Sequence, residues 1–214
     1  GSGGKDSAFA AHQLKAKYGM HPLTVTWAPH MYTEVGGKNF TNWLHVGGFD
    51  NYLFTPNGRV HRLLTRLAPE QVFHPFQPFI MGQMYFPPRI AAQLGIPLVF
   101  YGENPTEYGN DAKGDSKATK DKDFFSSADL SDIHLAGTSV ADLKGRFGLS
   151  EHDLAPYMPL QPDALDAAIA RAGAEAVAVC FLHSYRNDAH ERRAGAILRA
   201  MLPDAFVTLS VDIL

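Results

Sequence analysis

Two kinds of hydrophobic pattern alternate over the first hundred residues. Short apolar runs predict strands at 22–27, 52–55 and 96–101. Between these runs, apolar residues recur at helical spacing, which predicts helices at 8–18, 37–46, 60–67 and 90–94. Strands that alternate with helices are typical of βαβ units, so we predict an α/β fold with a parallel sheet.

The predicted sheet also indicates where a ligand binds. In sheets of this kind, ligands bind beyond the carboxyl ends of the strands. Three segments are expected there: residues 1–7, the stretch after Trp27, and residues 102–111. Residues 110–127 are polar and rich in Asp and Lys, which predicts a surface loop or mobile lid. Residues 74–88 are rich in Pro and aromatic residues and fit neither pattern.

The pattern changes near residue 160. Residues 162–214 are rich in alanine and predict an α-β-α-β run, with strands at 176–182 and 205–209. We therefore expect one domain over 1–160 and a second α/β segment over 161–214.

The composition is that of a globular protein, with 45% hydrophobic and 19% charged residues. The net charge of -3 argues against nucleic acid as a partner, because phosphate backbones need dense Lys and Arg patches. The single cysteine, Cys180, excludes an intrachain disulfide and a Cys-based zinc site. No apolar run approaches the ~18 residues of a membrane span, and no signal segment opens the chain. We expect a cytoplasmic protein with no membrane partner.

The Gly-rich run Gly1-Ser2-Gly3-Gly4-Lys5-Asp6-Ser7 leads directly into the first predicted helix. Such a turn aims backbone N–H groups and a helix N-terminus at an anion. Ser2 and Ser7 add hydroxyl donors, and Lys5 adds a positive charge for phosphate oxygens. Asp6 beside phosphates suggests a bridging Mg²⁺. The sequence therefore predicts a site for ATP and Mg²⁺.

Two alternatives to this interpretation are weaker. A Walker A loop needs Ser or Thr after its Gly-Lys pair, whereas Asp6 follows Gly4-Lys5 here. A Gly/Ser-rich cloning remnant would not explain why Lys5-Asp6-Ser7 continues into an amphipathic helix.

The run from Ser2 to Ser7 resembles the signature of the ATP-pyrophosphatase, or PP-loop, superfamily. Within it, residues 1–160 are similar to the N-acetyl sugar amidotransferases of bacterial surface-polysaccharide synthesis. The resemblance includes Val25 to Thr33, Gly48 to Asn51, Phe54 to Val60, His74 to Ile80 with Gly82-Gln83, Phe100 to Pro105 with Glu107 to Asn110, Gly148 to Ser150, Asp153-Leu154, Pro156-Tyr157 and Pro159-Leu160. It implies a parallel, doubly wound sheet of the PP-loop type, with the first strand, which would precede Gly1, missing from this sequence. For that reason we expect the chain to bind ATP poorly.

The same resemblance implies a reaction. ATP would adenylate the acetamido oxygen of a nucleotide-linked sugar, and ammonia would displace AMP to leave an acetamidino group. In that family a separate glutaminase subunit supplies the ammonia, and no glutaminase nucleophile is evident here. Cys180 sits in an apolar strand and is interpreted as a buried structural thiol.

Residue roles are implied by position within the resemblance. The implied catalytic residues are Lys5, Asp6 and Glu103, with Asp6 also binding Mg²⁺. The implied ATP-binding residues are Ser2, Gly3, Gly4, Lys5, Asp6, Ser7, Trp27, Gly102 and Asn104. Trp27 could equally be a core residue, and Glu103 and Asn104 could make helix-cap or loop contacts.

The remaining polar residues give weaker signals. His74, Gln77 and Gln83 could contact sugar or belong to a structural loop. The ten histidines include no H-E-x-x-H motif, and most are expected on the surface or in loops.

The last quarter of the chain resembles a different family. Ala176 to Tyr185, Ala189 to Arg193 and Leu202 to Val207 are similar to a segment near the N-terminal region of the hydantoinase/oxoprolinase family. That family hydrolyses cyclic amides, in some members with ATP, and no catalytic residue is carried over from it. Three hypotheses follow: a sugar amidotransferase, a hydantoinase/oxoprolinase-like fragment, and a non-catalytic nucleotide-binding module.

Overall fold

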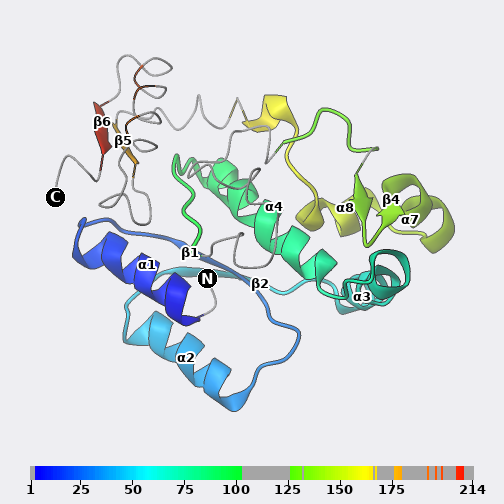
Figure 1. The fold of residues 1–214 in the computed structure, drawn as a ribbon, viewed down its shortest axis with the longest axis horizontal. Coiled ribbons are helices and arrows are strands. Elements are labelled where there is room, and N and C mark those ends of the chain that lie inside the picture. Colours follow the sequence, from blue (N-terminus) through cyan, green and yellow to red (C-terminus); the bar gives the residue numbers. More distant parts are fainter. Residues whose placement is uncertain are drawn as a thin grey trace.

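The computed structural model describes residues 3–102, 126–131 and 133–165 as continuous segments. Beyond them it describes residues 167, 176–179, 192, 196, 199 and 206–209. Figure 1 shows the arrangement of these elements.

The N-terminal half begins with a βαβ unit. Helix α1 (Lys5–Ala16) precedes strand β1 (Thr24–Trp27), and helix α2 (Glu34–His45) connects β1 to strand β2 (Asn51–Phe54). The two strands pair in parallel, with Thr24 opposite Asn51 and Trp27 opposite Phe54. The predicted helices at 8–18 and 37–46 and the strands at 22–27 and 52–55 are confirmed. In Figure 1, α1 and α2 lie on one side of the strand pair and α4 lies on the other.

A side-chain amide fixes the register of the two strands. Asn51 Nδ2 donates to Thr24 Oγ1 at 2.8 Å and to Thr26 Oγ1 at 2.9 Å. Thr24 Oγ1 in turn donates to the carbonyl of Asp50 at 2.8 Å. Both threonines are buried, so these bonds satisfy hydroxyl groups that would otherwise be costly to remove from water.

Two long helices follow the strand pair. Helix α3 (Gly58–Val72) contains the predicted 60–67 helix, and helix α4 (Gln77–Leu94) contains the predicted 90–94 helix. Most of the segment 74–88 is therefore the body of α4, which the sequence pattern did not indicate. Proline usually interrupts a helix, yet Pro87 and Pro88 lie inside this one.

The predicted strand at 96–101 is wrong. These residues are described and belong to no strand, whereas β1 and β2 pair with each other. An apolar, β-branched run becomes a strand only when a neighbouring ladder accepts it. The fold is therefore mixed α/β with a short parallel sheet, and the doubly wound sheet remains a prediction.

The second half of the chain adds small elements. Strands β3 (His134–Leu135) and β4 (Thr138–Ser139) form an antiparallel hairpin. Helices α7 (Val140–Phe147) and α8 (Glu151–Leu154) and the 3₁₀ turn η2 (Ala155–Tyr157) follow. Strands β5 (Ala176–Val179) and β6 (Phe206–Leu209) pair in parallel, which confirms the strands predicted near the end of the chain. No described helix is long and apolar enough to cross a membrane.

One hydrophobic core joins the two halves at Trp27. The indole of Trp27 contacts the rings of Phe54, Phe86 and Tyr157, with centroids 5.0, 5.7 and 5.1 Å away. The same cluster is completed by Val60, Leu64, Leu67, Ala68, Ile90, Leu135, Ala136, Leu143, Leu154 and Met158. The hairpin, α7, α8 and η2 therefore bury their apolar side chains against α3, α4 and the strand pair.

The indole of Trp27 lies directly on Gly82 of α4. A Cβ at position 82 would lie 2.5 Å from the ring, which is closer than packed atoms approach. We expect Gly82→Ala to lower the free energy of unfolding by about 1–3 kcal/mol, because the ring must move. Urea denaturation measures the change.

Gly145 in α7 is the matched control, because a Cβ there would meet nothing within 4 Å. We expect Gly145→Ala to raise stability by up to about 1 kcal/mol, through helix propensity alone. Equal behaviour of the two variants would contradict the close packing of Trp27.

Candidate functional site

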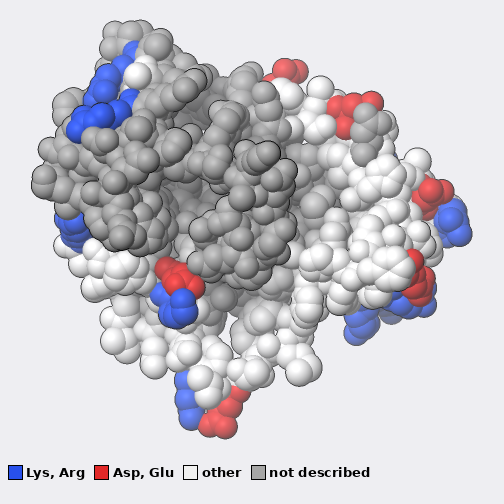
Figure 2. All heavy atoms as spheres, in the orientation of Figure 1, with Lys and Arg blue, Asp and Glu red and all other residues white. Residues whose placement is uncertain are grey.

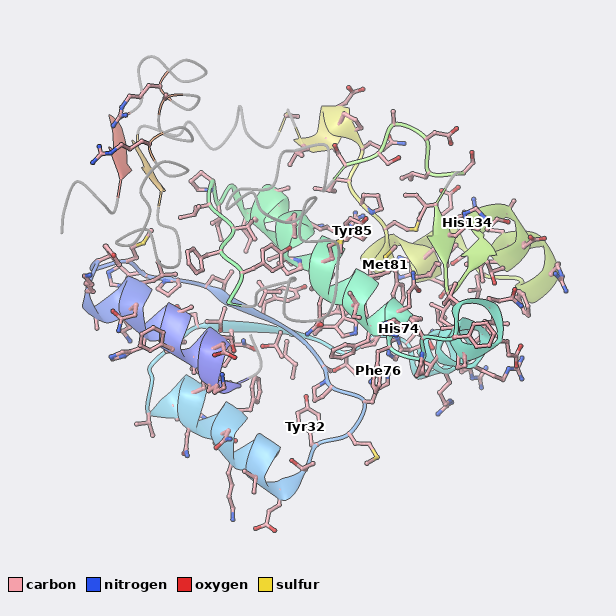
Figure 3. All side chains as sticks on the ribbon, in the orientation of Figure 1. Tyr32, His74, Phe76, Met81, Tyr85 and His134 are labelled. Carbon is pink, nitrogen blue, oxygen red and sulfur yellow. The ribbon has the colours of Figure 1, made fainter. Side chains whose placement is uncertain are left out.

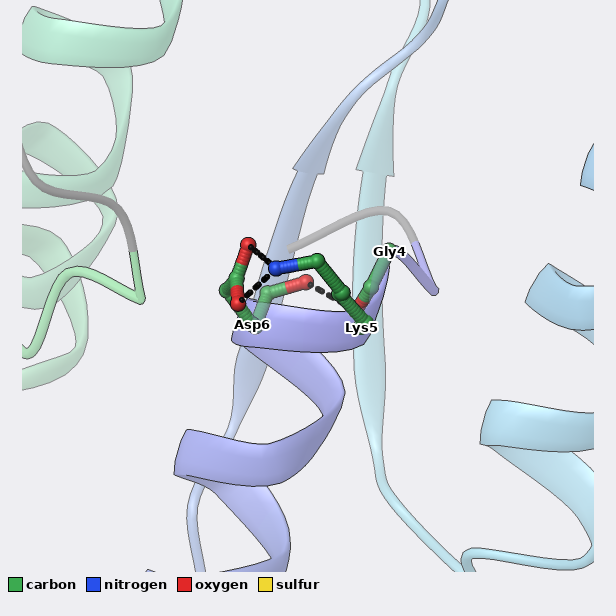
Figure 4. Close-up of polar contacts among 4 residues, drawn as sticks. Gly4, Lys5 and Asp6 are labelled. Carbon is green, nitrogen blue, oxygen red and sulfur yellow. Dashed lines mark hydrogen bonds and ion pairs between the residues drawn. The ribbon is translucent and has the colours of Figure 1, made fainter. Parts of the chain in front are cut away.

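The Gly-rich run starts α1, as expected. Gly4 is the N-cap, and Lys5 Nζ donates to both carboxylate oxygens of Asp6, at 2.7 and 3.0 Å (Figure 4). Both side chains are largely exposed, so the pair contributes little to stability and can reopen for a ligand. Ser7 Oγ donates to the carbonyl of Gly4 at 3.2 Å. Ser2 lies outside the described residues.

Two glycines bring other segments against this turn. Gly3 has a φ of +82°, and a Cβ there would lie 2.9 Å from the backbone nitrogen of Phe40 in α2. A Cβ on Gly102 would lie 2.6 Å from the Cα of Ser7. The structure thus brings Gly102 to the first turn of α1, as the predicted crevice requires. Glu103 and Asn104 follow Gly102 and lie outside the described residues.

The side chain of Trp27 is a core group. Only 4% of the residue is exposed, and its Nε1 has no hydrogen-bond partner. The ring therefore offers no free face to adenine, and the core-packing alternative agrees with the structure.

A pocket does open beside the carboxyl end of β1. It has a volume of about 140 Å³ and is lined by Thr26, Pro29, Met31, Tyr32, Thr33, Gly36 and Phe40. Typical ligand pockets measure ~300–1,000 Å³, so this one has room for only part of a ligand of that size. Because Phe40 also contacts Gly3, the pocket and the Gly-rich run are neighbours.

The sequence analysis assigned one residue, Asp6, to Mg²⁺, and the structure describes it. A single carboxylate is compatible with Mg²⁺, which usually takes one or two protein carboxylates and completes its shell with phosphates and water. Within the described ranges, no group of three or more His, Cys, Asp or Glu side chains is placed to hold a metal ion.

A chain of three side chains was not predicted: His61 and Tyr157 are buried, and His30 is exposed. His61 Nδ1 lies 2.9 Å from Tyr157 Oη, and His61 Nε2 lies 3.0 Å from His30 Nε2. His61 is 8% exposed, on the core face of α3, and is the exception among the described histidines, since the others are exposed as expected. The spacing of His61 from Leu64 and Ala68, three and seven residues on, was the available signal.

In either neutral tautomer of His61, one ring nitrogen donates and the other accepts. His61 therefore links the hydroxyl of Tyr157 to His30 in both tautomers.

Other residues singled out by the sequence have structural contacts. Gln77 Oε1 accepts from the backbone N–H of Ala136 at 2.8 Å, so Gln77 fixes the hairpin to α4. His74 and Phe76 lie at the start of α4 in Figure 3, with Met81 and Tyr85 further along it. His74 is exposed and Gln83 is half-buried.

Charged side chains form separate small groups on the face shown in Figure 2. The described ion pairs are Lys5–Asp6, Lys38–Glu34 and Lys144–Glu151. All three involve exposed groups, so they contribute little to stability.

Comparisons with known proteins match a segment that crosses the domain boundary expected near residue 160. The model of the hydantoinase/oxoprolinase N-terminal region matches residues 113–202. Caprolactamase subunit alpha from Pseudomonas jessenii is 45% identical over 58 residues, which are 26% of this chain and 8% of that protein. Cytochrome P450 CYP72A616 from Paris polyphylla is 30% identical over 146 residues, which are 62% of this chain and 26% of that protein. The chain thus spans only a small part of either relative.

These findings support the hydantoinase/oxoprolinase resemblance and extend it towards the N-terminus, to residue 113. Part of the matched range, from Leu135 to Met158, packs in the core around Trp27. Neither the family nor the two relatives carry the name of a sugar amidotransferase, and that resemblance remains a prediction.

His61 makes the stability of the fold depend on pH. Burial, and then the neighbouring His30, lower the pKa of His61 from 6.5 to about 4. Between these values the unfolded chain binds a proton that the folded chain does not. We expect the free energy of unfolding to be highest above about pH 6.5 and to fall by at most about 3 kcal/mol as the pH drops to about 4.

Thermal and urea denaturation across this range measure the effect. His61→Gln should remove most of the pH dependence, while His12→Gln, on an exposed part of α1, should leave it intact. A wild-type slope that persists in His61→Gln would contradict the assignment to His61.

Proposed function

We propose that this chain takes part in the ATP-linked hydrolysis of cyclic amides, as a piece of a hydantoinase/oxoprolinase-type protein. The observation that carries the proposal is the family match over residues 113–202. The relative named caprolactamase supports it, because a lactam is a cyclic amide.

The chemistry explains why a nucleotide is needed. Resonance stabilises an amide, so water opens an unstrained ring slowly. Coupling to ATP makes the opening favourable: ATP, two water molecules and the cyclic amide give ADP, phosphate and the ring-opened acid. On this proposal, the first turn of α1 would bind the nucleotide phosphates through backbone N–H groups and Lys5.

The second candidate is the sugar amidotransferase. It is favoured by the meeting of Gly102 with Ser7 and by the pocket beside Gly3 and Phe40. In that reaction the acetamido oxygen attacks the α-phosphorus of ATP, pyrophosphate leaves, and ammonia displaces AMP. Asp6 would hold Mg²⁺, which neutralises phosphate charge, and the pocket would take the adenine ring.

The nucleotide products separate the two candidates. The chain is incubated with Mg-ATP and hydantoin, 5-oxoproline or caprolactam, and in parallel with Mg-ATP, ammonia and a nucleotide-linked N-acetyl sugar. We expect ADP, phosphate and a ring-opened acid from the first mixture, measured by mass spectrometry. AMP and pyrophosphate from the second mixture alone would overturn the first candidate in favour of the second. Mg-ATP binding without turnover in either would favour a non-catalytic nucleotide-binding module.

Lys5 tests the nucleotide site itself. We expect Lys5→Ala to weaken Mg-ATP binding about tenfold, or ~1.4 kcal/mol, because a charge-assisted contact to phosphate is lost. Isothermal titration calorimetry measures both affinities.

Lys17→Ala is the matched control, because Lys17 lies at the opposite end of α1. Its affinity should equal that of the wild-type chain. An equal loss in both variants would show a general charge effect rather than a phosphate contact.

A further inference from the structure

The pocket beside the carboxyl end of β1 is bounded by β1, by the connection from β1 to α2 and by α2 itself. Four of its lining residues belong to the connection, on which Tyr32 is labelled in Figure 3. Its volume of about 140 Å³ is close to the ~150 Å³ of a cavity that holds one benzene molecule. The pocket therefore has room for one small ring.

The lining of this pocket is rich in hydrocarbon and carries no charge. Pro29, Met31 and Phe40 contribute apolar surface, and none of the described lining residues is Asp, Glu, Lys, Arg or His. A carboxylate placed in this space would lose water without meeting a cation, which is costly. Methylene groups, in contrast, are stabilised when such a surface removes them from water. The lining thus favours an uncharged ring that contains several methylenes.

A hydroxyl group in the lining is placed to orient such a ring. Oγ1 of Thr33 accepts from the N–H of Gly36 at 3.0 Å, so its own proton remains to donate to a ligand. The hydroxyl of Thr26 is already bonded to Asn51. Met31 and Tyr32 are 80% and 53% exposed and form the open mouth of the pocket. A ligand with one carbonyl oxygen, and with an N–H that stays hydrated at the mouth, matches this arrangement.

The pocket also lies next to the first turn of α1. Phe40 lines the pocket, and a Cβ on Gly3 would lie 2.9 Å from the backbone nitrogen of Phe40. A ring in the pocket would therefore lie near the turn that binds the nucleotide phosphates under the proposed function.

We infer that this pocket binds the ring of a small uncharged lactam, with the lactam carbonyl accepting from Thr33 and the methylenes packed against Met31 and Phe40. The inference rests on the proposed function for the reaction, and it names the class of cyclic amide and the place where it binds. A ring that carries a carboxylate, such as 5-oxoproline, meets no cation in the lining. Hydantoin has a second carbonyl and a second N–H and only one methylene, so it suits the apolar lining less well.

A series of ligands tests the chemistry of the pocket without ATP. Backbone amide chemical shifts are followed by NMR during titration with 2-pyrrolidinone, valerolactam and caprolactam. We expect the affinity to rise about threefold to fourfold with each added methylene, to a dissociation constant on the order of 1 mM for caprolactam. Hydantoin and 5-oxoproline should bind at least about tenfold more weakly than caprolactam. Equal affinities across these ligands would overturn the inference.

Gly36→Ala and Gly37→Ala form a matched pair of variants. A Cβ at position 36 would lie 2.9 Å from Oγ1 of Thr33, whereas a Cβ at position 37 would meet nothing within 4 Å. Both positions lie inside α2, where alanine is the better helix former, and urea denaturation checks that both variants fold. We expect Gly36→Ala to weaken caprolactam binding at least about tenfold, because the added methyl group displaces the hydroxyl donor. Gly37→Ala should bind as the wild type does, and equal affinities in the two variants would overturn the inference.

Ring opening with Mg-ATP is measured on the same samples, so that the site and the reaction are judged separately. Caprolactam that binds in the pocket and is never opened would support the pocket and contradict the proposed function. Ring opening without any shift of the pocket amides would support the proposed function and overturn the pocket. Adenosine is the second probe: if it shifts the pocket amides while caprolactam does not, the pocket belongs to a nucleotide base and the inference is wrong.

Discussion

The packing of the Trp27 indole on the bare backbone of Gly82 positions most of the described fold. Glycine lets α4 approach β1 closely enough for the ring to fill the space between the strand pair and the helix. Phe54 and Phe86 then close two sides of the ring, and Tyr157 approaches edge-on from η2. Because interiors are close-packed, a change at this point is transmitted to both halves of the chain.

The same core contains residues of the N-terminal half and residues of the segment that the family model matches. The family match begins at residue 113, and its hairpin, α7, α8 and η2 pack on helices of the N-terminal half. A nucleotide site at α1 and a cyclic-amide segment near the C-terminus would therefore share one structural unit as far as Met158. The buried side of that unit also carries Tyr157, whose hydroxyl lies 2.9 Å from Nδ1 of His61.

Local periodicity predicted much of the N-terminal half correctly. α1, β1, α2, β2 and α3 have local signals, in the form of apolar spacing and capping residues. The body of α4 was missed because its proline residues are normally signs of a break, whereas its burial against β1 and η2 outweighs them. The run at 96–101 has strand propensity but no neighbouring strand to pair with. Whether such a partner is present depends on the tertiary structure.

The candidate site was predictable in part. The Gly-rich turn at the start of α1 follows from the local motif. Its approach to Gly102 was expected from a strand at 96–101, which the structure does not contain. The burial of Trp27 could not be predicted from the sequence. A tryptophan at the end of a strand can face a ligand or the core, and the surface that packs against it determines which. The contact between His61 and Tyr157 joins residues 96 positions apart, which no local pattern reveals.

A double-mutant cycle between Trp27 and Tyr157 tests the shared core most directly. Unfolding free energies are measured for the wild-type chain, Trp27→Leu, Tyr157→Leu and the double variant. Edge-on aromatic pairs contribute about 0.5–1.5 kcal/mol beyond area burial, and we predict a coupling energy of about 1 kcal/mol. A coupling energy of zero would mean that β1 and η2 do not share a core.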